Sequence, residues 1–335
     1  MQSIKEPVKS ALVVGLILLL CGSMSLLRAA GPTRKGKEVC ARYSIPASVT
    51  AGRFRFAGED IPIQRRDVRR RIRHELNFLL LDARSVLTLW LKEKSRYQWI
   101  FEEIFSKEGI PRDFVLFAPI LSGLSARSYR KLSGEGWWAI NKPCNASEGA
   151  AMAKNSWSDD RKDLELSTRC FASRLKKIRK ELRTSSWITA AAAYVTSTQT
   201  VKDLGKHWNT LYFWNLPLPE NADELIVRWI ALGIIDANRA DFGIKIKGAR
   251  AWTYDHVTGL TLAKDLPIAK IAHMTGTAPR KILLLNPRLK PSRPILPAKV
   301  HGRRIKHSLA VPKGKGWVLV KKLAAQGYLV KKGKR

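Results

Sequence analysis

Apolar residues recur at helical spacing through the first part of the chain. Residues 60–94 place them three or four apart, which predicts a long helix. Its inner face is expected to carry Val68, Ile72, Leu76, Leu79, Leu80, Val86, Leu87 and Leu89. A second amphipathic helix is expected over residues 97–107, ended by Gly109 and Pro111.

The stretch 109–139 has a different pattern. An apolar run, residues 114–121, predicts a buried helix that breaks at Ser122 and Gly123. A basic loop follows and leads to Gly136, Trp137 and Trp138. A turn after a buried helix, followed by paired tryptophans, is typical of a cleft wall with an aromatic floor.

Further helices are predicted over residues 164–182, 186–194 and 222–238, so the chain to about Gly243 is expected to form one mainly α domain. The other stretches are expected to form no long helix, although the loop at 141–156 is expected to contain short helical turns. They are an exposed linker at 31–52, an extended piece at 54–59, a loop at 141–156, and short strands at 317–320 and 328–330 in a basic, partly disordered tail.

The charge of the chain is extreme. It has 61 Lys and Arg against 27 Asp and Glu, a net charge of +34, and residues 266–335 contain no acid at all. Such a surface attracts polyanions: nucleic acid, anionic lipid or anionic wall polymer. The arginine run at 65–73 is either the solvated face of a helix or part of a polyanion-binding surface.

The N-terminus narrows this choice. Lys5 and Lys9 precede an apolar run from residue 11 to residue 20, the arrangement of a secretory signal or an uncleaved membrane anchor. Leu20 before Cys21 fits a lipidation signal poorly. Export is therefore expected, to the periplasm or cell envelope, which argues against nucleic acid as the partner.

Cysteine and histidine usage indicates no metal site, since neither residue type shows ligand spacing, and no cofactor is expected. If a leader is removed, Cys40, Cys144 and Cys170 remain. Cys144 and Cys170 could pair in an oxidising compartment, but buried free thiols are the favoured interpretation.

Several motifs, taken together over about residues 54–312, resemble the membrane-bound, D-type family of lytic murein transglycosylases. The family's Glu-Ser-Gly falls on Leu121-Ser122-Gly123, and its Gly-aromatic-Trp-Gln-Phe falls on residues 136–140. Its Asp-x-Arg-x-Asp-x-x-x-Ser-Thr block falls on residues 159–168, and its Ala-Ala-Tyr-Asn-Ala-Gly falls on residues 192–197. The stretches 214–220 and 265–312 resemble its Leu-Pro-Glu-Thr region and its wall-binding, LysM-like tail.

This resemblance implies a mainly α, lysozyme-like domain with a small basic LysM-like module. The expected divisions are 1–30 (signal or anchor), 31–95 (linker and first helical segment), 96–245 (transglycosylase-type domain) and 246–335 (LysM-like tail). It also implies a glycan-binding cleft formed by Ser122, Gly123, Gly136, Trp137, Trp138 and Tyr194. For Tyr194, a place in the buried core is an equal alternative.

The family's chemistry needs one carboxylic acid, which protonates the glycosidic oxygen and then, as a base, helps to close a 1,6-anhydro ring. That glutamate maps onto Leu121, which can neither give nor take a proton. The cleft glutamine and the asparagine after the tyrosine map onto Ala139 and Val195. Three changes from polar to apolar indicate lost catalysis and a pocket turned into core.

Glu135 is the nearest replacement acid, although an exposed loop carboxylate among basic neighbours is the simpler interpretation. Three functions remain open. The first is a non-catalytic exported protein that binds peptidoglycan strands, with anionic wall polymer, membrane surface or other cell-wall enzymes as further partners. The second is an active transglycosylase with a relocated acid such as Glu135. The third is a purely structural role without glycan binding.

Overall fold

The structure is a computed structural model that describes residues 43–126, 134–148 and 150–330. These residues belong to one compact unit, Arg42–Arg335, which is separate from residues 1–41. The predicted signal or anchor, Cys21 and Cys40 therefore lie outside the described residues. Within the described part of the chain, none of the helices combines the length and the apolarity needed to cross a bilayer.

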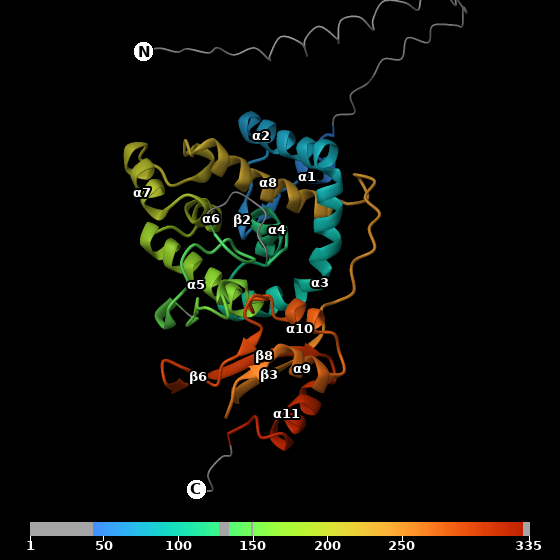
Figure 1. The fold of residues 1–335 in the computed structure, drawn as a ribbon. Helices are drawn as coiled ribbons and strands as arrows, with labels where there is room; N and C mark the ends of the chain where they lie inside the picture. The colour runs from blue at the N-terminus through green and yellow to red at the C-terminus, as the bar shows by residue number, and fades with distance from the viewer. Residues whose placement is uncertain (1–42, 127–133, 149, 331–335) are drawn as a thin grey trace, which may run out of the picture. The chain divides into compact units, whose positions relative to one another are not determined.

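Helices dominate the unit, which confirms the predicted mainly α fold. The N-terminal two thirds form a helical part around one large core, with a smaller apolar cluster where α5, α6 and α7 meet (Figure 1). Its elements are α1 (Ala47–Thr50), β1 (Arg55–Phe56), β2 (Glu59–Asp60), α2 (Arg66–Asn77), a π-helical turn (Phe78–Asp82), α3 (Arg84–Glu108), a 3-10 turn (Arg112–Leu116), α4 (Phe117–Ser122), α5 (Leu164–Leu182), α6 (Trp187–Val195), α7 (Thr198–His207) and α8 (Glu220–Ala237).

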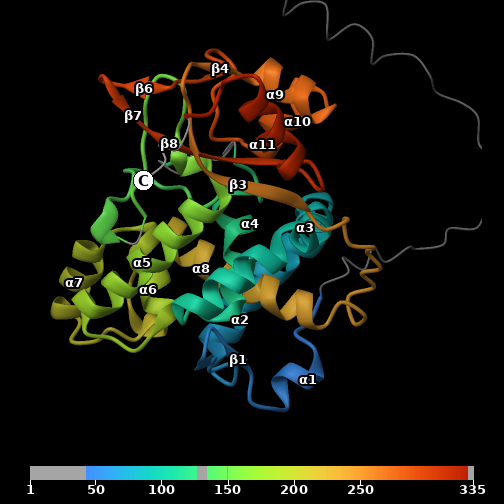
Figure 2. The same cartoon turned by 90° about the horizontal axis from the view of Figure 1, so that it is seen from below.

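Helix α4 lies in the middle of this part, between α3, α5, α6 and α8 (Figures 1 and 2). Local signals explain the ends of several helices. Gly109 ends α3 with a left-handed φ of 68°, and Asp163 begins α5 by accepting a hydrogen bond from the Leu166 amide at 3.0 Å. The helices predicted from 164, 186 and 222 are all present.

The helical part differs from the expected pattern in two places. The helix expected over 60–94 is interrupted by the π-helical turn, and α3 then runs unbroken through the expected gap before residue 97. The domain division expected between residues 95 and 96 stays a prediction, and both residues belong to α3. The expected exposed linker, as far as it is described, is anchored because Ile45 and Val49 are buried in that core.

The remaining residues form a small C-terminal module with its own core. An antiparallel pair, β3 and β8, encloses two helices in a β–α–α–β order, and a third helix follows. The elements are β3 (Tyr254–Thr261), β4 (Leu266–Pro267), α9 (Ile268–Thr275), α10 (Pro279–Leu285), β5 (Ile295–Leu296), β6 (Lys299–Val300), β7 (Arg303–Arg304), β8 (Lys306–Pro312) and α11 (Gly316–Ala325).

Two predictions for this region need correction. Residues 317–320 belong to α11 and not to a strand, because Leu319 and Leu323, four residues apart, face the module core. The expected partly disordered tail is instead folded as far as residue 330, where Leu329 forms a bridge to Leu262. Residues 328–330 thus have the extended character that was predicted for them.

The loop before α5 is one place where the module contacts the helical part. Trp157, which precedes α5, is buried in the module core and lies with its ring centroid 5.2 Å from that of His307. The Asp159 amide donates to the Arg288 carbonyl at 2.8 Å, and the Lys290 amide donates to the Trp157 carbonyl at 2.9 Å. The two cores are therefore joined by a short backbone ladder.

Candidate functional site

The position that the resemblance assigns to the catalytic acid lies at the end of α4, inside the core. Leu121 is 1% exposed and packs in the core of the helical part. Ser122 is also buried, and its Oγ donates to the Ala118 carbonyl at 3.1 Å. Gly123 then ends the helix with a φ of 67°, a conformation that favours glycine. Neither side chain before this turn reaches solvent to act on a ligand.

The predicted aromatic floor is also mostly core. Gly136 lies so close to Arg161 that a Cβ there would be 1.8 Å from the Arg161 carbonyl oxygen, so only glycine fits. Trp138 is fully buried, stacks on Phe171 with centroids 4.1 Å apart, and donates from Nε1 to Oγ1 of Thr168 at 2.9 Å. Trp138 therefore offers no ring face to a sugar.

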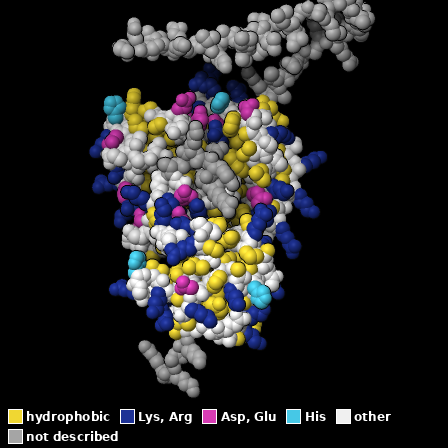
Figure 3. Space-filling view, in the orientation of Figure 1, with side chains coloured by type: hydrophobic (Ala, Val, Ile, Leu, Met, Phe, Trp, Pro, Cys, Tyr) yellow, Lys and Arg dark blue, Asp and Glu magenta, His cyan; other side chains and the backbone are white. Residues whose placement is uncertain are grey.

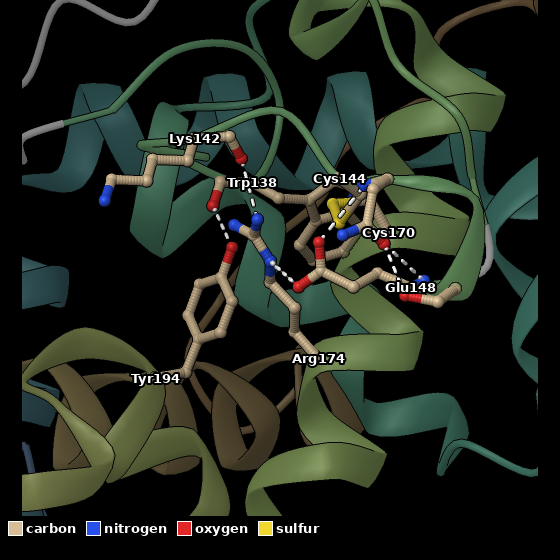
Figure 4. The surroundings of a disulfide bond; sticks show 9 residues. Trp138, Lys142, Cys144, Glu148, Cys170, Arg174 and Tyr194 are labelled. Atoms are coloured by element: carbon tan, nitrogen blue, oxygen red, sulfur yellow. Dashed lines mark hydrogen bonds and ion pairs between the residues drawn. A yellow bond between two sulfur atoms is a disulfide. The ribbon is translucent and has the colours of Figure 1, made fainter.

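Tyr194 holds this floor in place. Its Oη donates to the Trp138 carbonyl at 2.7 Å (Figure 4). Its ring also meets the ring of Phe171 edge-on. Burial raises the pKa of Tyr194, so the hydroxyl stays protonated and remains a donor. Ala139 and Val195, the other two positions that lack the family's polar side chain, pack against the same core.

The nearby carboxylates are paired with basic side chains. Glu135 is 42% exposed, and its carboxylate lies 3.1 Å from Nζ of Lys162. Its backbone exchanges two hydrogen bonds with Ile140, which holds it in a tight hairpin. Glu148 lies 3.7 Å from Nε of Arg174 and accepts a hydrogen bond from the Asn145 amide (Figure 4). Glu135 thus has the surroundings of an ion-paired loop acid.

Cys144 and Cys170 form a disulfide, so the favoured interpretation of them as free thiols was wrong. The bond ties the loop after the Trp pair to α5 (Figure 4). Both sulfurs are buried in the core of the helical part. The sequence left this pairing open because nothing in it indicated that residue 144 folds back onto α5.

A cavity of about 530 Å³ lies beside this region, between the helical part and the C-terminal module. Of the six predicted glycan-binding residues, Trp137 lines it and the other five do not. Trp137 contacts Tyr97 edge-on, with centroids 4.8 Å apart, and Trp252 lies next to Tyr97. The cavity thus has an aromatic wall made by α3, the Trp pair and the segment before β3.

A carboxylate faces the same cavity from α5. Glu165 accepts a hydrogen bond from Oη of Tyr254 at 2.8 Å, and Nδ1 of His256 lies 3.5 Å from the same oxygen. Burial, and then the charge of Glu165, raises the pKa of Tyr254, which therefore remains a hydrogen-bond donor. This arrangement combines donors, acceptors and aromatic rings in one hollow, as small-molecule sites do.

Other charges around the cavity are structural. Arg161 and Asp159 form a bidentate pair, with their closest atoms 2.6 Å apart, and this pair lowers the pKa of Asp159 although burial opposes it. Arg288, from the module, contacts Asp160 at 3.1 Å and donates to the Ser308 carbonyl at 2.5 Å. These pairs fix the loop that joins the two cores.

The sequence did not single out Glu165, Tyr254 or His256. Glu165 and Tyr254 are 89 residues apart, and neither carries a spacing signal toward the other. Among the described residues there is no cluster of histidine, cysteine or acidic side chains that could hold a metal ion.

Comparison with known proteins relates the chain, at a distance, to lytic transglycosylases. It is 23% identical over 257 residues to the membrane-bound lytic murein transglycosylase D of Escherichia coli K12, and equally to that of an Escherichia coli O6:H1 strain. The match covers 72% of this chain and 54% of each relative, so the chain spans about half the length of these relatives. No protein-family model matches the chain.

Proposed function

We propose that the protein is an exported, non-catalytic, transglycosylase-like protein that binds peptidoglycan in the cell envelope. One observation carries the loss of catalysis: Leu121, at the position of the family's acid, is sealed in the core. General acid–base catalysis by a positioned side chain contributes about 10²–10⁴-fold, and this position supplies none of it. The distant similarity to transglycosylases supports peptidoglycan as the ligand.

Glycan binding is assigned to the cavity rather than to the former cleft. Its wall of Tyr97, Trp137 and Trp252 suits the apolar faces of sugar rings, while Glu165 and His256 can hydrogen-bond hydroxyl or N-acetyl groups. Its volume of about 530 Å³ lies within the usual range of ligand sites. The β–α–α–β order of the module supports a LysM-like, wall-binding role for the second half of this site.

Retention on purified sacculi tests this assignment. Trp252→Ala and Glu165→Gln are expected to reduce retention of the full chain several-fold, because the first removes an aromatic surface from the cavity and the second replaces a charged carboxylate, which only accepts, with a neutral amide. Trp317→Ala is the matched control, since Trp317 is 74% exposed on α11 and does not line the cavity. Retention should also decrease as salt is raised, since the chain carries a net charge of +34.

Wild-type retention by both cavity variants, at unchanged melting temperature, would overturn the assignment of glycan binding to this cavity. Equal losses for Trp317→Ala and Trp252→Ala would do the same, because they would indicate general surface adhesion rather than binding at one site.

A further inference from the structure

Charged side chains of α2 and α8 form ion pairs between the two helices. Nε of Arg71 donates to Oδ2 of Asp223 at 3.1 Å, and Nε of Arg228 donates to Oε2 of Glu75 at 2.5 Å. The pairs follow the same order along both helices, so α2 and α8 run in the same direction where they meet. Part of the arginine run at 65–73 is therefore turned toward α8 and not toward solvent.

A second cavity, of about 280 Å³, opens between these helices. Besides the pair Arg71 and Asp223, it is lined by Arg70, His74, Glu75, Glu224 and Val227. Figure 3 shows basic, acidic and histidine side chains together on the surface over α2 and α8. None of the described residues lines both this cavity and the larger one, so the two are separate.

The carboxylates of this cavity outnumber the cations that neutralise them. Arg71 neutralises Asp223, but Glu75 and Glu224 share Arg228, which lies 2.5 Å from the first and 3.6 Å from the second. Within the described chain, Arg228 is also the one donor of a hydrogen bond to the Glu75 carboxylate, although Glu75 is only 2% exposed. Burial raises the pKa of Glu75 and outweighs the opposite effect of Arg228. One carboxylate charge is thus left over.

Arg70 supplies the complementary charge on the same cavity. It is exposed, and it forms no ion pair with any carboxylate of the described residues. His74 lies one turn later on the same side of α2, where its ring can donate or accept a hydrogen bond. The cavity therefore has one unpaired guanidinium and one excess carboxylate that do not reach each other.

We propose that the α2–α8 cavity binds a small zwitterion with one ammonium and one carboxylate group, the chemistry of a free apolar amino acid. The ammonium group lies against Glu75 and Glu224, and the carboxylate lies against Arg70. Val227, which is 1% exposed, provides an apolar surface for the side chain of the ligand. The volume is just below the usual range of about 300–1,000 Å³ for ligand sites, which suits a molecule of this size.

The same charges argue against a polyanion at this cavity. Three carboxylates in its walls repel a chain of phosphate or carboxylate groups, although the cavity lies on the arginine-rich helix. No residue of the larger cavity takes part, so the proposal is independent of the glycan-binding assignment.

Calorimetric titration of the full chain with leucine tests the proposal, with two derivatives that each lack one charge. Leucinamide has the ammonium group without the carboxylate, and N-acetylleucine has the carboxylate without the ammonium group. Leucine is expected to bind roughly ten-fold or more tightly than either derivative, because each loses a charge-assisted hydrogen bond. Equal binding of the three compounds, or no saturable heat with leucine at millimolar concentration, would overturn the proposal.

Two arginine variants locate the carboxylate. Arg70→Ala should weaken leucine binding by roughly ten-fold and leave leucinamide binding unchanged, since leucinamide has no carboxylate. Arg73→Ala is the matched control, because Arg73 is exposed on the same helix and does not line the cavity. Equal losses of leucine binding in the two variants would show a general effect of charge and would contradict a site at this cavity.

Glu224→Gln tests the other end of the ligand. It removes a negative charge from a side chain that is 44% exposed, so the fold should be preserved. This variant should weaken the binding of leucine and leucinamide alike, and it should not weaken the binding of N-acetylleucine. Wild-type affinity for leucine in this variant, at unchanged melting temperature, would contradict the place assigned to the ammonium group.

Discussion

At the scale of single residues, Leu121 decides what the helical part can do. Its surroundings are those of a core leucine, because its side chain is 1% exposed and packs among apolar residues. The polar groups nearby have partners of their own: Ser122 bonds to the α4 backbone, and Tyr194 bonds to the Trp138 carbonyl. Restoring the family's glutamate alone would therefore place a carboxylate in core.

Leu121→Glu is expected to destabilise the protein by about 4 kcal/mol near neutral pH, because burial raises the pKa of an unpaired carboxylic acid by several units. The folded pKa would lie above the unfolded value, so the loss should deepen as pH rises from about 4 to about 8. Urea unfolding at both ends of this range measures it. Leu121→Met, which conserves volume, should cost less than about 1.5 kcal/mol.

Equal stability of the Leu121→Glu and Leu121→Met variants near neutral pH would contradict this prediction. Solvent would then reach this position, and the description of the former cleft as core would be wrong.

His307 makes a second residue-scale prediction. It is buried in the module, and its Nε2 lies 2.8 Å from the Pro297 carbonyl. Burial lowers the pKa of His307 below its usual value. As pH falls below about 6.5, the unfolded chain binds a proton that the folded module excludes, so stability falls by at most about 1.4 kcal/mol per pH unit for this group.

His307→Gln should lose less stability than wild type between about pH 7.5 and pH 5.5, as measured by thermal unfolding. His301→Gln is the control, because His301 is exposed in the same module. If wild type and His307→Gln respond equally to pH, the buried imidazole does not contribute to the acid sensitivity of the module.

At the scale of elements, the disulfide ties the loop after Trp138 to α5 across 26 residues. Closing a loop of this length stabilises a fold by about 3–4 kcal/mol through the entropy of the unfolded chain. Cys144→Ala with Cys170→Ala should lower the free energy of unfolding by that amount, and reduction of wild type should do the same. Cys40→Ala serves as the control, since Cys40 is not part of this bond.

Unchanged stability after reduction, with thiol labelling to show that the bond had opened, would contradict this contribution.

The elements also show where the sequence was informative. Helices α5, α6 and α8 were predicted because each has an amphipathic or uniformly apolar pattern with clear ends. The π-helical turn was not predicted, because its one extra residue leaves no mark in the spacing of the apolar positions. Val86 and Leu89 were therefore expected on the buried face of the helix, whereas both side chains are exposed. Leu121 and Trp137 were singled out in the sequence because they align with motif positions of the family. Glu165 and Tyr254 are brought together only by the tertiary fold, so the sequence could not indicate that they form one site.

At the scale of the whole molecule, the helical part and the C-terminal module each have a core of their own, and a cavity of about 530 Å³ lies between them. Trp157 and the ladder beside it hold the module against the helical part, which creates the cavity lined by Trp137, Glu165 and His256. On the proposed function, this cavity would bind glycan, while Leu121, at the position that the resemblance assigns to the acid, packs in the core.

Incubation of the purified full chain with sacculi, followed by mass spectrometry of the muropeptides, tests the central claim most directly. An active lytic transglycosylase serves as the positive control. We expect the protein to be retained on the sacculi and to release no 1,6-anhydro products. The contradicting result is the appearance of anhydro-muropeptides with wild type and their disappearance with Glu135→Gln or Glu165→Gln, which would identify a relocated catalytic acid.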